Sequence, residues 1–147
     1  MVLEPLDNRK SYRRQFRLPI EDSREIERQI TEMHHHVIIE PSENAEFNAP
    51  VFLVAKKSGT KWLVIDLHSI NTLIRPQILA LSKITELVEE IVMQQSAYLS
   101  SCDLFSGYYQ IKIDKNSRKY CTFTSPLTGN RWAYRRAPFG LVNSPAI

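Results

Sequence analysis

Residues 98–113, YLSSCDLFSGYYQIKI, decide how the rest of the chain is interpreted. The first part of this stretch is apolar and rich in β-preferring residues, and it leads to a single acid, Asp103. Ser106 and Gly107 then indicate a turn before a second strand-like run, residues 108–113. A lone carboxylate at the end of a strand is a candidate functional group. Asp also caps turns by accepting a hydrogen bond from its own backbone two residues further on, and the local pattern alone favours that alternative.

A second motif lies downstream in residues 135–147, RRAPFGLVNSPAI. Together, CDLFSGYYQIKI and APFGLVNSPA resemble the palm motifs of reverse transcriptases, in particular those of gypsy-type LTR retrotransposons. That family commonly shows LDL-x-SGY-x-QI followed by MPFGL-x-NAPA. The resemblance extends over about residues 15–147. It implies the fingers and the N-terminal part of the palm of the right-hand polymerase fold, incomplete before the family's Y-x-DD motif.

The composition limits the class of protein. With 147 residues, 43% of them hydrophobic, the chain is long enough for one modest core. A net charge of +3 and a pI near 8.9 suit a nucleic-acid partner without requiring one. Cys102 and Cys121 show no pairing pattern, which predicts two buried free thiols in a reducing compartment rather than a disulfide or a zinc site.

Targeting signals are not visible in the sequence. No apolar run approaches the roughly 18 residues that span a bilayer, and Met1 is not followed by a basic region and an apolar core of secretory type. We therefore expect no membrane partner and an intracellular protein that is cytoplasmic, particle-associated or nuclear.

Residues 1–18 are predicted to form a basic arm, and residues 19–147 the partial reverse transcriptase domain. The arm carries five Arg and Lys residues against two acids, a balance of 5 − 2 = +3. Such an arm either lies along phosphates or is a solvated entry segment. The family has a similar R-x-YR-x-P sequence before its first helix.

A helix is predicted over about residues 23–35, because Ile26, Ile30 and Met33 recur at helical spacing. Asp22 and Glu25 have the spacing of a capping box, with Ser23 as a rival N-cap. Residues 34–36 are three consecutive histidines, which point about 100° apart on a helix and cannot converge on one metal ion.

Residues 51–55 and 61–66 are β-rich runs joined across residues 56–60, which predicts a hairpin with Gly59 at the turn. The resemblance implies that this hairpin is the fingers, which fold down on the incoming nucleotide. Lys56 then occupies the position of a family lysine that reaches the triphosphate, and an ammonium suits phosphate oxygens. The alternative is a turn lysine that only adds solubility.

The hairpin and the residues after it depart from the family pattern in three respects. Relatives usually read W-R-x-x-x-D-Y-R-x-L-N, whereas this chain reads WLVIDLHSIN over residues 62–71. It is one residue short between Trp62 and Asp66, no arginine follows the tryptophan, and the second arginine is His68. In the family the first of these arginines lies against the base and phosphate of the nucleotide, and leucine does not replace a planar guanidinium. Side chains alternate between the two faces of a strand. The missing residue therefore moves every side chain on one side of it to the opposite face, unless a bulge or turn compensates.

The second half of the chain completes an α+β prediction. Ser82 is the candidate N-cap of a core helix that runs to about Gln95, although the family's proline-rich helix entry is absent here. Strands are predicted over residues 120–124 and 132–136, with turns at 114–117 and 127–130. Antiparallel hairpins packed on two helices make one α+β layer pair. The basic residues of this half are either a phosphate track or a solvated face.

The resemblance implies the chemistry of DNA synthesis. Polymerases extend a primer by in-line attack of a 3′ hydroxyl on an α-phosphate, assisted by two Mg2+ ions, which Mn2+ can replace. Asp103 would be the catalytic and bridging metal ligand, and the backbone carbonyl of Leu104 a further ligand. Since one acid cannot hold two ions, we expect this chain alone to be inactive. Ser144 and Pro145 suit the start of a helix, so the sequence ends where a helix is expected to begin.

Three further residues match the family's nucleotide site. Tyr108 is at the position where a bulky ring lies under the sugar and excludes a 2′ hydroxyl, which implies a preference for deoxynucleotides. Phe139 and Gly140 match the pocket floor, where glycine permits close backbone approach. The alternatives are a half-buried strand tyrosine and a plain turn. The partners implied are deoxynucleoside triphosphates, an RNA template with its DNA primer held by duplex shape and phosphates, and the remainder of a Pol polyprotein.

Two other hypotheses stay open at this stage. The first is a decayed or domesticated remnant that acts only as a nucleic-acid-binding or interaction module; the missing arginine favours decay, whereas Asp103, Gly107 and Tyr108 favour recent activity. The second is a soluble α+β domain whose likeness to polymerases is accidental.

Overall fold

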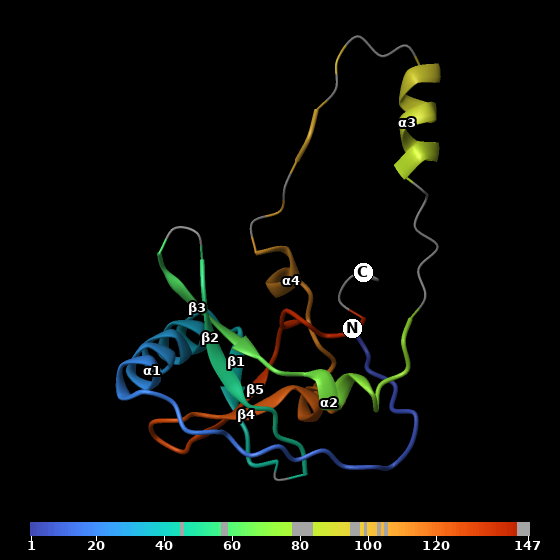
Figure 1. Cartoon of the computed structure of the whole chain (residues 1–147). Coiled ribbons are helices and arrows are strands. Elements are labelled where there is room, and N and C mark those ends of the chain that lie inside the picture. The colour runs from blue at the N-terminus through green and yellow to red at the C-terminus, as the bar shows by residue number, and fades with distance from the viewer. Residues whose placement is uncertain are drawn as a thin grey trace.

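The computed structural model describes residues 1–44, 46–56, 59–77, 84–94, 98, 100–102, 104 and 106–143. The helices are α1 (Ile20–His35), α2 (His68–Asn71), α3 (Ile84–Met93), α4 (Gly107–Gln110) and the 3-10 helix η1 (Lys115–Cys121). The strands are β1 (Ile39–Pro41), β2 (Val51–Ala55), β3 (Lys61–Ile65), β4 (Thr122–Thr124) and β5 (Arg131–Tyr134). Helices and antiparallel sheets share one core, so the predicted α+β class is confirmed (Figure 1).

A three-stranded antiparallel sheet, in the order β1-β5-β4, forms one part of the body. The two strands predicted here are present in shorter form, since β4 begins at Thr122 and β5 ends at Tyr134. β1 was not predicted, because its three residues include Pro41 and are too few for a visible alternation. Phe123 and Tyr134 are fully buried, with ring centroids 5.6 Å apart.

The predicted hairpin is confirmed as the two-stranded sheet β2-β3. Its pairing runs without a bulge from Val51 opposite Ile65 to Ala55 opposite Lys61. The turn is closed by the amide of Lys56, which donates to the carbonyl of Thr60 at 2.7 Å. Gly59 has a φ of 83°, a conformation that L side chains rarely adopt.

Helix α1 packs the apolar stripe Ile26, Ile30 and Met33 into the core. Each such side chain contributes about 1.5–3 kcal/mol when it leaves water. The predicted capping is wrong, because the helix begins three residues earlier, after Pro19, and has no side-chain cap. The Asp22 carboxylate accepts instead from Lys61 Nζ at 2.6 Å, and Ser23 donates to the carbonyl of Pro19.

The basic arm of residues 1–18 lies along the body (Figure 1). Leu3 belongs to the core, and backbone hydrogen bonds join Leu6 to Leu73 and Arg13 to Asn48. Arg13 also forms an ion pair with Asp66 at 2.8 Å. The arm is therefore anchored at several points, while Arg14 and Arg17 form no ion pair with any described residue.

Helix α3 stands away from the body (Figure 1). The prediction of a buried core helix is wrong, because its described side chains, among them Leu87, Val88 and Ile91, are exposed. Its apolar spacing is real, but no described element packs closely against it. The predicted cap Ser82 lies outside the described residues. No helix in the described part of the chain is both apolar enough and long enough to cross a bilayer.

The stretch that opened the sequence analysis differs most from expectation. Its described residues before Ser106 belong to no strand, and residues 107–110 form the helical turn α4. The predicted second strand, residues 108–113, pairs only at its end, where Lys112 forms an antiparallel bridge with Arg136. Ser106 adopts the left-handed conformation, with φ 50°, and so redirects the chain into that turn. The prediction of two buried thiols is also wrong, since Cys102 is exposed; Cys121 is fully buried, and burial raises its pKa to about 12.

Candidate functional site

A cleft of about 720 Å³ lies between the C-terminal half of α1, the β2-β3 hairpin and the segment that contains α4. Residues far apart in the sequence line it. One wall is α1, the second is the hairpin from Lys56 to Leu63, and the third combines Ser106, Tyr109 and Gln110 with Phe139. A cleft of this size, with aromatic walls and a few polar groups, is large enough for a nucleotide-sized ligand.

An aromatic cluster adjoins the cleft. Trp62, Tyr109 and Phe139 line the cleft, whereas Tyr108 contacts Phe139 without being part of the lining. The ring of Phe139 is central to the cluster, with its centroid 5.0 Å from Trp62, 5.1 Å from Tyr108 and 5.6 Å from Tyr109. All three pairs meet edge to face, with interplanar angles of 69°, 86° and 77°, the geometry that aromatic quadrupoles favour. All four rings are half-buried. Burial raises the pKa of Tyr109 above its ordinary value, so this hydroxyl stays protonated at neutral pH.

Lys56 places a cation beside this cluster. It follows β2 directly, and its Nζ lies 5.6 Å from the centroid of the Trp62 ring. Side chains two residues apart on a strand share a face, and Val54 is paired with Trp62, so Lys56 is placed diagonally from that ring. The lysine side chain is exposed and forms no ion pair with a described carboxylate. Two predicted site residues, Tyr108 and Phe139, are thus in contact, and the third, Lys56, joins them through Trp62.

Gly140, the other predicted site residue, has a φ of 85°. No atom lies within 4 Å of the position that a Cβ would take, so the backbone conformation, rather than crowding, requires glycine here. Asn71 holds the turn. Its Nδ2 donates to the carbonyl of Gly140 at 2.8 Å, and its Oδ1 accepts from the amide of Val142 at 3.0 Å. Because Asn71 ends α2, it ties the Phe139 turn to the body.

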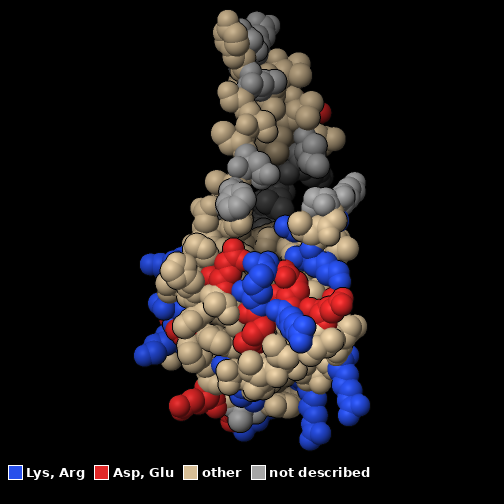
Figure 2. All heavy atoms as spheres, turned by 90° about the vertical axis from the view of Figure 1, so that its left-hand side faces the viewer, with Lys and Arg blue, Asp and Glu red and all other residues tan. Residues whose placement is uncertain are grey.

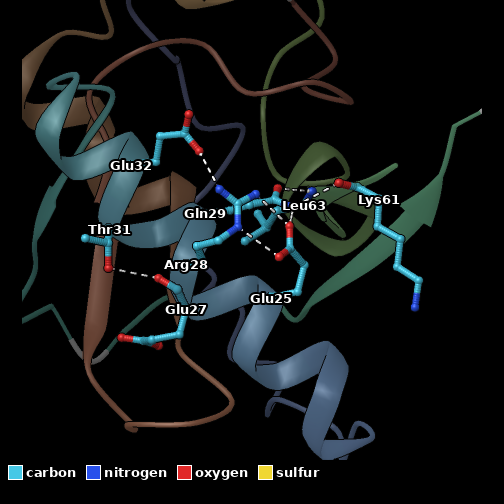
Figure 3. Close-up of polar contacts among 8 residues, drawn as sticks. All are labelled: Glu25, Glu27, Arg28, Gln29, Thr31, Glu32, Lys61 and Leu63. Carbon is cyan, nitrogen blue, oxygen red and sulfur yellow. Dashed lines mark hydrogen bonds and ion pairs between the residues drawn. The ribbon is translucent and has the colours of Figure 1, made fainter. Parts of the chain in front are cut away.

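The α1 wall of the cleft carries an ordered polar network (Figure 3). Arg28 bonds Glu25 at 2.8 Å and Glu32 at 3.1 Å. The hydrogen bond from Arg28, with a second from Gln29, lowers the pKa of Glu25 to about 2. Figure 2 shows the result on this face, where Lys and Arg side chains alternate with Asp and Glu. The α1 wall therefore presents neutralised pairs, and among the described Lys and Arg residues that line the cleft, Lys56 is the one without an ion pair.

Gln29 fastens the hairpin to α1. Its Nε2 donates to the carbonyl of Lys61 at 2.9 Å, and its Oε1 accepts from the amide of Leu63 at 2.8 Å (Figure 3). The side-chain amide thus pairs with the free edge of β3 on both sides of Trp62. This contact takes the place of a third strand and fixes the orientation of Trp62 relative to α1.

The two substituted arginine positions have separate environments. Leu63 is buried in the core, whereas His68 is exposed and its Nδ1 lies 2.5 Å from an oxygen of Asp66. Burial alone would raise the pKa of Asp66, but hydrogen bonds from His68 and the charge of Arg13 outweigh burial and lower it. Asp66 therefore stays ionised and ties the hairpin to the N-terminal arm.

Asp103, the predicted catalytic residue, lies outside the described residues. Leu104, whose carbonyl was predicted as a metal ligand, is exposed. Within the described part of the chain, no three His, Cys, Asp or Glu side chains gather where they could hold a metal ion. One carboxylate and one carbonyl suit a hard cation in kind, but they fall short of the octahedral oxygen shell that Mg2+ requires.

Sequence reasoning missed Trp62, Tyr109, Asn71 and Gln29 as contributors to the cleft. Asn71 could have been found, because it is the last residue of the family's D-Y-R-x-L-N pattern. The contact between Trp62 and Phe139 could not, since it joins segments that only the tertiary fold brings together.

Comparison with known sequences agrees with this arrangement. Residues 7–147 match the family described as "Reverse transcriptase (RNA-dependent DNA polymerase)". The chain is 32% identical over 145 residues to the retrovirus-related Pol polyprotein from transposon 412 of Drosophila melanogaster, covering 95% of this chain and 11% of that protein. The corresponding protein from transposon opus of the same species is 33% identical over 141 residues, covering 92% and 14%.

The Pol polyprotein from transposon gypsy of Drosophila melanogaster is 26% identical over 152 residues. That alignment covers 99% of this chain and 14% of the relative. The chain thus spans between a tenth and a seventh of the length of these relatives.

Proposed function

This chain belongs to the reverse transcriptase family, within the group represented by retrotransposon Pol polyproteins, and we propose that it forms the nucleotide-binding region of an RNA-directed DNA polymerase. The architecture proposed is the right-hand polymerase fold, with the β2-β3 hairpin as fingers and the segment around α4 as the start of the palm. One observation carries the proposal. Lys56, Trp62 and Phe139 line one cleft, with the Lys56 ammonium over the Trp62 ring and Trp62 in ring contact with Phe139, and Tyr108 contacts Phe139 from beside the cleft.

Each of these groups has a specific role in the proposal. The Lys56 ammonium neutralises the triphosphate oxygens of the incoming nucleotide, since it is exposed and forms no ion pair with a described acid. The Tyr108 ring packs under the sugar and leaves no room for a 2′ hydroxyl. The left-handed turn at Gly140, held by Asn71, keeps Phe139 in place as the floor of the pocket.

Asp103 and the carbonyl of Leu104 are proposed as two oxygen ligands for Mg2+, or for Mn2+ in its place. When bound, such an ion would stabilise negative charge on phosphate oxygens. Because the donors present are too few for a complete site, no reaction step is assigned to a metal ion. The template RNA and primer DNA are proposed to bind through their phosphates, for which the basic residues Arg14 and Arg17 of the N-terminal arm are suitable contacts.

Binding of a deoxynucleotide to variants of the whole chain tests the proposal. Equilibrium dialysis with radiolabelled dTTP in the presence of Mg2+ should give saturable binding. A Lys56→Gln variant should bind about tenfold more weakly, because a charge-assisted contact to phosphate is lost. Lys115→Gln is the matched control, since Lys115 is also exposed but does not line the cleft.

The two variants distinguish nucleotide binding at a specific site from binding to the overall positive charge of the chain. Equal weakening by Lys56→Gln and Lys115→Gln would mean that triphosphate binds to net positive charge, and an absence of saturable binding by the unmodified chain would contradict the proposed function outright.

A further inference from the structure

Trp62 lines the cleft, with the Lys56 ammonium over its ring and Phe139 in contact with it, and no role follows for it from the motifs. We propose that Trp62 is the residue on which the base of the incoming nucleotide stacks, in place of the arginine that this hairpin lacks. This inference rests on the proposed function and assigns a new base-positioning residue within that site.

The strand register places Trp62 in the position of the missing arginine. The family pattern W-R-x-x-x-D sets the arginine four residues before the acid, and 66 − 62 = 4. The pairing of β2 with β3 is continuous, so no bulge absorbs the missing residue between Trp62 and Asp66. Counted from the acid, Trp62 and not Leu63 therefore has the facing of the arginine, and Leu63 is accordingly buried in the core.

The surroundings of Trp62 suit a planar ligand with a negative charge. The ring edge packs on Phe139, the indole is half-buried, and the exposed Lys56 ammonium lies over the ring. A nucleotide can replace the contact between the Lys56 ammonium and the Trp62 ring by two stronger contacts: its base would stack on the indole, and its phosphates would bind the ammonium. The exchange is favourable because a base stacked on an aromatic ring is held more strongly than an exposed cation over that ring.

The backbone around Trp62 is already ordered for such a role. Gln29 bonds the carbonyl of Lys61 and the amide of Leu63, the residues on either side. The ring orientation is therefore fixed before a ligand arrives, which reduces the loss of conformational entropy on binding. The competing explanation is that Trp62 only supports Phe139 and touches no ligand.

Tryptophan fluorescence gives a direct test, because the chain has only two tryptophans, Trp62 and Trp132. A Trp132→Phe variant of the whole chain retains Trp62 as the sole indole. With excitation at a wavelength where the nucleotide does not absorb, titration with dATP should quench the emission. The midpoint should equal the dissociation constant from equilibrium dialysis, as stacking requires.

Three substitutions at Trp62 then measure the contribution of the ring. Trp62→Leu should weaken dATP binding about tenfold, whereas Trp62→Phe should retain most of the affinity because it keeps an aromatic face. Trp62→Arg restores the family's side chain and should also bind. Circular dichroism melts of all variants establish that each is folded at the temperature of the titration.

The outcomes separate this inference from the proposed function. If Lys56-dependent binding persists while Trp62→Leu changes the affinity less than twofold and dATP leaves the emission unchanged, the stacking role is overturned and the proposed function stands. If Trp62→Phe loses as much affinity as Trp62→Leu, the indole acts by filling space and stacking is again overturned. If the unmodified chain binds no nucleotide, both fail.

Discussion

Single residues in the cleft differ in how directly the sequence reveals them. Lys56, Tyr108 and Phe139 were predicted from motifs. In the fold, Lys56 and Phe139 line one cleft, and Tyr108 contacts Phe139. Trp62 appeared in the sequence as the start of a defective motif, because the pattern was counted forward from the tryptophan. When the pattern is counted back from Asp66 along the unbroken strand, Trp62 falls at the position of the family's arginine. Only the strand pairing shows that counting from the acid is correct.

Tyr108 should decide between ribose and deoxyribose. We expect Tyr108→Val to raise the affinity for rATP relative to dATP several-fold, since the smaller side chain leaves room for a 2′ hydroxyl. The measurement is the ratio of the two dissociation constants in competition dialysis. Tyr12→Val is the control, because Tyr12 is exposed and does not line the cleft. An unchanged ratio for Tyr108→Val would show that this ring does not face the sugar.

At the scale of elements, the sequence predicted those that have strong local patterns. The hairpin follows from two β-rich runs around Gly59, and α1 follows from the spacing of Ile26, Ile30 and Met33. The helical turn α4 was missed because its tyrosines favour strands, and a strand forms only where a partner edge is present. α3 has the apolar spacing of a core helix, yet its described side chains are exposed, since periodicity does not specify what covers a face.

The end of α1 contains a locally strained residue. Val37 follows the helix with a φ of 59°, and the amide of Ile38 donates to the carbonyl of Met33 at 2.9 Å, the closing bond of a Schellman motif. This position of the motif normally holds glycine. The left-handed conformation costs a residue with a side chain about 1–2 kcal/mol.

We therefore expect Val37→Gly to increase the free energy of unfolding by about 1 kcal/mol, the relief of strain less the greater entropy of an unfolded glycine. Val37 is exposed, so little burial is lost. Urea denaturation, with the midpoint compared at constant slope, measures the change. Val37→Ala keeps the conformational cost and should give no gain; equal stabilisation by alanine would attribute the effect to removal of an exposed apolar side chain.

For the whole molecule, the class and family could be predicted from the sequence, whereas the cleft could not. The residues that line it come from α1, the hairpin, α4 and the Phe139 turn, and their distances depend on how these elements pack. Local patterns carry no information about such long-range contacts. Two links hold the arrangement in place: Gln29 ties β3 to α1, and Asn71 ties the Phe139 turn to α2.

The central claim is that a deoxynucleotide binds in the cleft between the hairpin and the segment around α4. Photo-crosslinking of 5-iodo-2′-deoxyuridine triphosphate to the whole chain, followed by peptide mapping, tests it most directly. We expect saturable adducts on Trp62, Tyr108, Tyr109 or Phe139 that excess dTTP suppresses. Adducts confined to other parts of the chain, such as the basic helix η1, or adducts that dTTP does not suppress, would contradict it.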